Sequence, residues 1–164
     1  MGVMSSAIFH AEQDISSFGG GNYVGGAADL QLDGMQSVAE TRDAVVVTTN
    51  YRLGFFGWLG GWQMGSVDAR RSTGNVGFLD QRAALIWASE NAAVFGGDAS
   101  RLMLFGESAG AASVSMHMVS PGSRGLFTRA AMQSGAFVPW ASKSRETAQA
   151  IFDWFLRATG CEVA

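Results

Sequence analysis

Short apolar segments alternate along the chain with segments of helical period. AVVVTTN (Ala44–Asn50) is β-branched and apolar, which is typical of a strand buried on both faces of a parallel sheet. RLMLF (Arg101–Phe105) and AAMQS (Ala130–Ser134) are shorter runs that predict two further strands.

Helices are predicted between and after these strands. Residues 77–93 carry apolar side chains at helical spacing, and the pair Gly96-Gly97 that follows is typical of a helix end. Small residues over Gly110–Val119 predict a second helix, and Thr147–Ala158 predicts an amphipathic third. Strands that alternate with helices indicate an α/β architecture with a parallel sheet. We expect the buried face of the first helix to consist of Leu79, Ala83, Ile86 and Trp87.

The composition supports a folded domain and excludes some functions. Of the 164 residues, 48% are hydrophobic and 15% charged, which is enough apolar surface for a buried core. The net charge is −3 and Lys143 is the single lysine, so the chain has no basic stripe for nucleic acid. No uninterrupted apolar run reaches about 18 residues, so we expect no membrane span.

Two further features bear on cellular context. The first ten residues lack a basic segment followed by a long apolar run, so we expect no signal peptide, and the location stays open. Cys161 is the single cysteine. It is therefore either a free thiol or one half of a bridge whose partner lies outside this sequence.

The clearest chemical motif is Gly106-Glu107-Ser108-Ala109-Gly110, between a predicted strand and a predicted helix. Gly-x-Ser-x-Gly in that setting is the nucleophile elbow, in which a tight turn lifts the serine hydroxyl above the sheet. The alternative is a structural serine in a glycine-rich turn. The strand–turn–helix setting favours a nucleophilic Ser108, with the Ala109 amide directed at a developing oxyanion.

A second glycine cluster lies in the N-terminal part of the chain. Phe18-Gly19-Gly20-Gly21-Asn22 lets the backbone approach a substrate closely and offers its amides as hydrogen-bond donors. Alone it would be taken for an ordinary loop. Together with the elbow it favours an oxyanion hole.

Three segments carry a resemblance to a known family. Gly74–Phe127, Thr48–Leu59 and Met132–Ala141 resemble the type-B carboxylesterases, which include the cholinesterases, and the likeness extends over residues 18–161. The resemblance implies an α/β-hydrolase fold and hydrolysis of carboxylic esters by a serine, an acid and a histidine. It implies no cofactor and no metal.

The resemblance also assigns roles by position. Ser108 matches the nucleophile and Glu107 the acidic residue beside it. Trp140 lies where the family lines its acyl pocket, so we expect Glu107 and Trp140 to contact substrate. The oxyanion donors correspond to Gly20, Gly21 and Ala109.

The N-terminal segment departs from the family pattern. The family has a buried apolar strand before its glycine triplet, whereas Ala11–Phe18 reads AEQDISSF and predicts no good strand. We therefore divide the chain into a divergent segment, residues 1–17, and a partial α/β-hydrolase domain, residues 18–164. The family's acid and histidine lie beyond the matched region.

His117 is not expected to serve as the catalytic base. It follows Ser108 by nine positions on the predicted helix, which at about 1.5 Å per residue places it about 13 Å away. A base must come within about 3 Å of the hydroxyl. We expect a packed helix residue, and we expect Glu146, Asp153 and Glu162 to lie on a solvated helix face.

The sequence thus predicts a serine carboxylic ester hydrolase whose triad acid and histidine are missing from these residues. By itself this chain is expected to be inactive or nearly so. Two alternatives are a non-catalytic, cholinesterase-like adhesion or partner-binding module and an inactive truncated product. An intact Ser108 argues against the adhesion class, whose members typically lose the nucleophile. The particular ester and the oligomeric state stay open.

Overall fold

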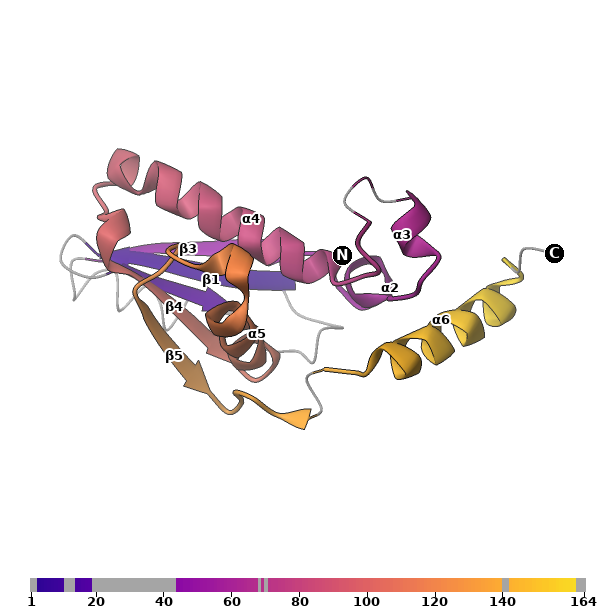
Figure 1. The fold of residues 1–164 in the computed structure, drawn as a ribbon. Coiled ribbons are helices and arrows are strands. Elements are labelled where there is room, and N and C mark those ends of the chain that lie inside the picture. Colours follow the sequence, from indigo (N-terminus) through magenta and orange to yellow (C-terminus); the bar gives the residue numbers. More distant parts are fainter. Residues whose placement is uncertain are drawn as a thin grey trace.

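The fold is a β-sheet with two helices packed on one face (Figure 1). It is known from a computed structural model that describes residues 3–10, 14–18, 44–67, 69, 71–139 and 142–161. The strands are β1 (Val3–His10), β2 (Asp14–Phe18), β3 (Ala44–Tyr51), β4 (Leu102–Glu107) and β5 (Arg129–Gln133).

The sheet has the strand order β1-β3-β2-β4-β5, with additional β1–β2 and β1–β4 pairings. Strand β2 runs parallel to β3 and β4, and β4 runs parallel to β5. Strand β1 runs antiparallel to its neighbours. The predicted parallel sheet is therefore correct for four strands and wrong for β1.

Helices connect and follow the strands. The predicted helices are present, with bounds shifted by one or two residues. The first of them continues into a short 3-10 helix, which ends at Gly96 in a left-handed conformation with φ 82°. The α-helices are α2 (Gly54–Trp58), α3 (Met64–Val67), α4 (Val76–Asn91), α5 (Ala109–Val119) and α6 (Arg145–Thr159). Short 3-10 helices are η2 (Ala92–Phe95), η3 (Ala99–Arg101) and η4 (Pro121–Ser123).

The N-terminal segment joins the sheet, which corrects our prediction for residues 14–18, whereas residues 11–13 lie outside the described ranges. Asp14–Phe18 forms β2, in register with β4 at Asp14↔Leu102 and Phe18↔Gly106. Backbone pairing on both sides overrides the weak strand propensity of this polar sequence. The boundary predicted after residue 17 falls inside β2.

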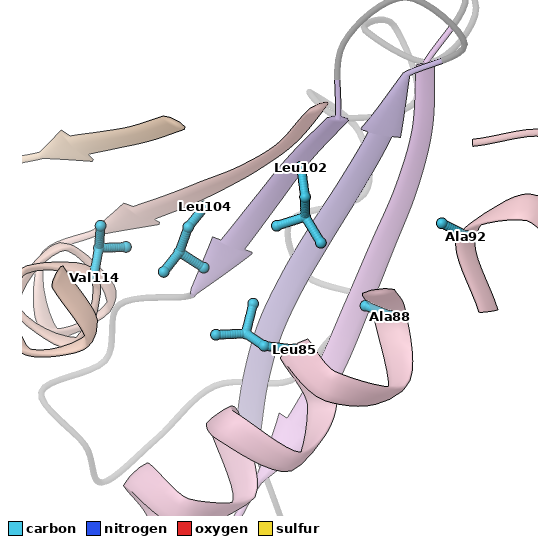
Figure 2. Close-up of a cluster of buried hydrophobic side chains, with 6 residues drawn as sticks. All are labelled: Leu85, Ala88, Ala92, Leu102, Leu104 and Val114. Atoms are coloured by element: carbon cyan, nitrogen blue, oxygen red, sulfur yellow. The ribbon is translucent and has the colours of Figure 1, made fainter. Parts of the chain in front are cut away.

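The core lies between β4 and helices α4 and α5. Leu102 and Leu104 alternate with half-buried residues along β4, so both face the helices and are fully buried. Figure 2 shows them beside three residues of α4 and η2 and one of α5. The cluster consists of Leu85, Ala88, Ala92, Leu102, Leu104 and Val114.

Two burial predictions are wrong. Helix α4 packs through Gln81, Leu85 and Ala88. Of the residues that we expected on this face, Leu79 is half-buried, and Ala83, Ile86 and Trp87 are exposed. Apolar residues lie on both faces of this helix, so helical spacing alone did not identify the face that packs. Residues 44–49 of β3 are half-buried, because the described helices α4 and α5 cover one face of the sheet.

Helix α6 projects from the rest of the fold and contacts the segment around α2 (Figure 1). Gln149 accepts a 2.8 Å hydrogen bond from the backbone amide of Trp62, and the rings of Phe55 and Phe155 lie 4.6 Å apart. Phe152 is the one buried residue of α6. None of the helices in the described ranges is long and apolar enough to cross a membrane.

Candidate active site

The turn between β4 and α5 is the tight strand-to-helix turn that the Gly-x-Ser-x-Gly motif predicts. Strand β4 ends at Glu107, α5 begins at Ala109, and Ser108 lies between them with φ 52° and ψ −116°. These angles match the first central residue of a type II′ turn, where glycine is usual. Ser108 occupies the N-cap position, but its side chain makes no capping hydrogen bond. The hydroxyl is therefore not used to stabilise the helix end.

Glycine at position 106 permits the close approach of β4 and α5. A Cβ placed on Gly106 would overlap the backbone carbonyl of Gly110 and lie 2.7 Å from the nitrogen of Ala111. The first five residues of α5 are also small and buried, so the helix can lie against the strand. Any side chain at position 106 would therefore push the helix away from the strand.

The end of β5 supports the elbow, and sequence reasoning did not identify this contact. The Ser108 amide donates a 2.8 Å hydrogen bond to the carbonyl of Gln133. A Cβ on Gly135 would lie 2.5 Å from the Ser108 carbonyl oxygen. The available signal was the position of Gln133-Ser134-Gly135 at the end of a predicted strand, since ends of adjacent parallel strands meet at one sheet edge.

The other predicted site residues fall partly inside the described ranges. Glu107 ends β4 and is half-buried, and Ala109 is fully buried at the first position of α5. Gly20, Gly21 and Trp140 lie outside the described residues. Their predicted roles remain predictions.

His117 is confirmed as a packed helix residue, with only 1% of its surface exposed. Nδ1 lies 2.8 Å from the Ser123 hydroxyl and Nε2 lies 3.3 Å from Oε1 of Gln81. Its ring stacks on Phe78 with centroids 4.1 Å apart. Burial, together with the positive charge of Arg82, lowers the pKa of His117 to about 3. The imidazole is thus neutral at physiological pH and bonded to groups other than Ser108.

The remaining candidates for chemistry lie away from the elbow. Glu146 is exposed, Asp153 is half-buried and accepts a hydrogen bond from Gln149, and Glu162 lies outside the described residues. Cys161 is a free, exposed thiol. Within the ranges that the structure describes, no cluster of three or more His, Cys, Asp or Glu residues could hold a metal ion.

A cavity of about 750 Å³ lies between the body of the fold and the start of α6. Phe78 and Met116 line it on one side, and Arg145 and Ile151 on the other. Ser108 is not among its lining residues, so we do not assign this cavity to the proposed reaction.

Comparison with known proteins identifies the family. The sequence model described as the carboxylesterase family matches residues 16–164. The chain belongs to the carboxylesterase family. This carboxylesterase chain is 45% identical over 147 residues to the acetylcholinesterase of Gallus gallus and 47% identical over 143 residues to that of Danio rerio. Each alignment covers 87% of the chain.

Solved structures agree on the fold. A protein described as a thermophilic pNB esterase matches with a TM-score of 0.75 and 35% identity, over 89% of this carboxylesterase chain and 29% of that protein. The predicted α/β-hydrolase fold is confirmed. The chain spans 18% of the Gallus gallus relative and 22% of the Danio rerio relative.

Proposed function

We propose that this chain supplies the nucleophile of a carboxylic ester hydrolase, and that the nucleophile is Ser108. The single observation that carries the proposal is the backbone conformation of Ser108, with φ 52° and ψ −116° between β4 and α5. A non-glycine residue held in this region is strained, and such strain concentrates at functional sites. Membership of the carboxylesterase family supports ester hydrolysis as the chemistry of that strained serine.

In the proposed reaction, the Ser108 oxygen attacks the ester carbonyl carbon and forms a tetrahedral intermediate. The amide of Ala109, together with the amides of Gly20 and Gly21, donates hydrogen bonds to the oxygen that becomes negative. The Ser108 proton passes by way of a general base to the leaving oxygen, the alcohol departs, and water then releases the acid from the acylated serine and restores the hydroxyl. Glu107 and Trp140 would contact the bound ester.

Neither histidine of this sequence suits the role of general base. His117 is buried and bonded to Gln81 and Ser123. His10 pairs with Ala44 at the start of β3, and its strand meets β4 at Ile8↔Met103. This register places His10 opposite residue 101, about 23 Å along the strand from Ser108 at a rise of about 3.3 Å per residue. These 164 residues would therefore supply the nucleophile and oxyanion donors, and not the base.

The proposed substrate class is a small carboxylic ester. That class is shared by the acetylcholinesterases and the pNB esterase to which the chain is similar. Nothing in the described residues selects one ester over another.

A fluorophosphonate probe tests the proposed nucleophile. We expect a covalent adduct on Ser108 by mass mapping, absent in Ser108→Ala and present in Ser66→Ala, which removes an exposed serine elsewhere. Nitrophenyl acetate should be hydrolysed slowly, because losing general-base help costs about 10²–10⁴ in rate. An adduct on another serine would overturn the assignment. So would rapid turnover that His117→Ala abolishes while the protein stays folded.

A further inference from the structure

A series of hydrogen-bonded side chains connects helix α4, the turn η4 and the first turn of α5. Its members are unusual for a core, because they are polar and almost fully buried. None of them takes part in the proposed reaction. The buried members are Gln81, Ser113, His117 and Ser123, with exposures of 0%, 0%, 1% and 1%.

In this hydrogen-bond series, each group donates to the next in one consistent order. At one end the Ser113 hydroxyl lies 3.0 Å from the carbonyl of Ala109, which can only accept, so Ser113 donates there. Ser113 then accepts from Nε2 of Gln81 at 3.0 Å. This orientation of the amide turns Oε1 of Gln81 toward Nε2 of His117, which must therefore carry the proton.

The opposite end of this hydrogen-bond series is compatible with the same direction. Arg82 can only donate, and its Nε lies 3.4 Å from the Ser123 hydroxyl oxygen. Ser123 is thus free to donate its own proton to Nδ1 of His117, 2.8 Å away. The order of donation is Arg82, Ser123, His117, Gln81, Ser113 and the Ala109 carbonyl. The Ser113 end assigns the tautomer of His117, and the Arg82 end is compatible with it.

This hydrogen-bond series ends at Ala109, the residue that follows Ser108. The Ala109 carbonyl belongs to the first turn of α5, and the Ala112 amide donates to the Ser108 carbonyl in that same turn. Gln81 and Ser113 therefore join α4 to the turn that carries the nucleophile. Because Ser108 is held in a strained conformation, its hydroxyl depends on neighbours that keep this turn fixed.

We propose that His117 is a positioning residue, which acts through Gln81 and Ser113 to hold the first turn of α5 and thereby the hydroxyl of Ser108. The inference rests on the proposed role of Ser108 as nucleophile. It assigns His117 neither acid nor base chemistry. Its ring is fixed as the neutral tautomer with the proton on Nε2, stacked on Phe78.

The kinetic test compares variants of the whole chain by fluorophosphonate labelling, with the saturating rate and the half-saturating concentration measured separately. A misplaced reacting group lowers the rate by up to about a hundredfold. We expect Ser113→Ala and His117→Leu to lower the saturating rate at least about fivefold at an unchanged half-saturating concentration. His117→Gln, which retains a donor toward Gln81, should recover part of the loss.

Ser115→Ala is the matched control. Ser115 is also buried on α5 and donates a hydrogen bond to the carbonyl of Ala112, but it is not a member of the hydrogen-bond series from Arg82 to Ala109. Its labelling rate should stay within about twofold of wild type, whatever it costs in stability. Equal losses in Ser113→Ala and Ser115→Ala, or wild-type labelling in both Ser113→Ala and His117→Leu, would overturn the proposal. If His117→Leu does not fold, Ser113→Ala decides.

Nuclear magnetic resonance separates this inference from the proposed function. The ¹⁵N signals of His117 should indicate a protonated Nε2 and an unprotonated Nδ1 from about pH 5 to 8. Amide shifts over residues 108–110 should change in Ser113→Ala and not in Ser115→Ala. If wild-type Ser108 is not labelled, the proposed function fails, and these signals still decide the positioning role. The opposite tautomer, or unchanged shifts in Ser113→Ala, would refute it.

Discussion

The backbone amide of Ser108 donates a 2.8 Å hydrogen bond to the carbonyl oxygen of Gln133. The residue at the elbow is thereby joined to the end of β5, a strand that follows it by more than twenty positions in the sequence. The proposed nucleophile depends on long-range packing as well as on its own motif.

Gly135→Ala should destabilise the elbow. The new methyl would lie 2.5 Å from the Ser108 carbonyl oxygen and 3.0 Å from the Cβ of Ala111, both in the packed interior. Overpacking of this kind typically costs about 1–3 kcal/mol in the free energy of unfolding. Denaturant unfolding measures the loss. Gly65→Ala is the control, because its new Cβ would meet its nearest atom at 3.4 Å, and a similar loss in both variants would contradict the steric explanation.

Ser108→Gly should be more stable than Ser108→Ala. Both variants remove the hydroxyl, but only glycine adopts φ 52° and ψ −116° without steric cost. Glycine relieves the backbone strain, but it also loses more conformational entropy on folding. The two effects together leave Ser108→Gly more stable by about 1 kcal/mol in the free energy of unfolding. Urea midpoints at equal slopes would measure it. Equal midpoints would mean that the turn is unstrained.

Stability should fall as the pH falls below the ordinary pKa of histidine. Burial lowers the pKa of folded His117 to about 3 from its ordinary value of 6.5, so between these values the unfolded chain binds the extra proton. The contribution of His117 is fully present above about pH 6.5 and decreases by at most about 1.4 kcal/mol per pH unit below it. The measurement is the free energy of unfolding against pH, for wild type and for His117→Gln. Parallel profiles for the two proteins would contradict this assignment.

The ion pair between Arg52 and Asp80 should contribute modestly to the free energy of unfolding. The guanidinium bonds both carboxylate oxygens at 2.7 Å, and Asp80 also accepts from the Arg52 amide at 3.0 Å. The Arg52 side chain is 55% exposed, so solvent screening limits Arg52→Lys to a loss below about 1 kcal/mol. Asp80→Asn should lower the free energy of unfolding more, because it also weakens the hydrogen bond from the backbone amide of Arg52. Urea unfolding at low and high salt checks both, and an equal or reversed order would refute the added role of the amide.

Local motifs made part of this fold predictable. The glycines around Ser108 and the apolar run before it identify the elbow because strand, turn and helix are adjacent in sequence. Strands β3, β4 and β5 lie within two residues of their predicted bounds for the same reason.

Contacts between distant segments were not predictable in the same way. Strand β2 is polar and forms because β3 and β4 supply hydrogen bonds on either side. The packed face of α4 contains Gln81, which spacing rules assign to solvent, because its partner Ser113 lies on another helix. Gly135 supports Ser108 only once β4 and β5 are paired.

The tight approach of α5 to β4 limits which sequences this region can accept. The first five residues of α5 are buried. Between Gly106 and this helix there is no space for a single added carbon atom. A library that randomises positions 109–113 should therefore retain mainly glycine, alanine and serine. The same library over α6, where only Phe152 is buried, should retain a broad range of residues. Tolerance to mutation would thus differ sharply between two helices of one chain.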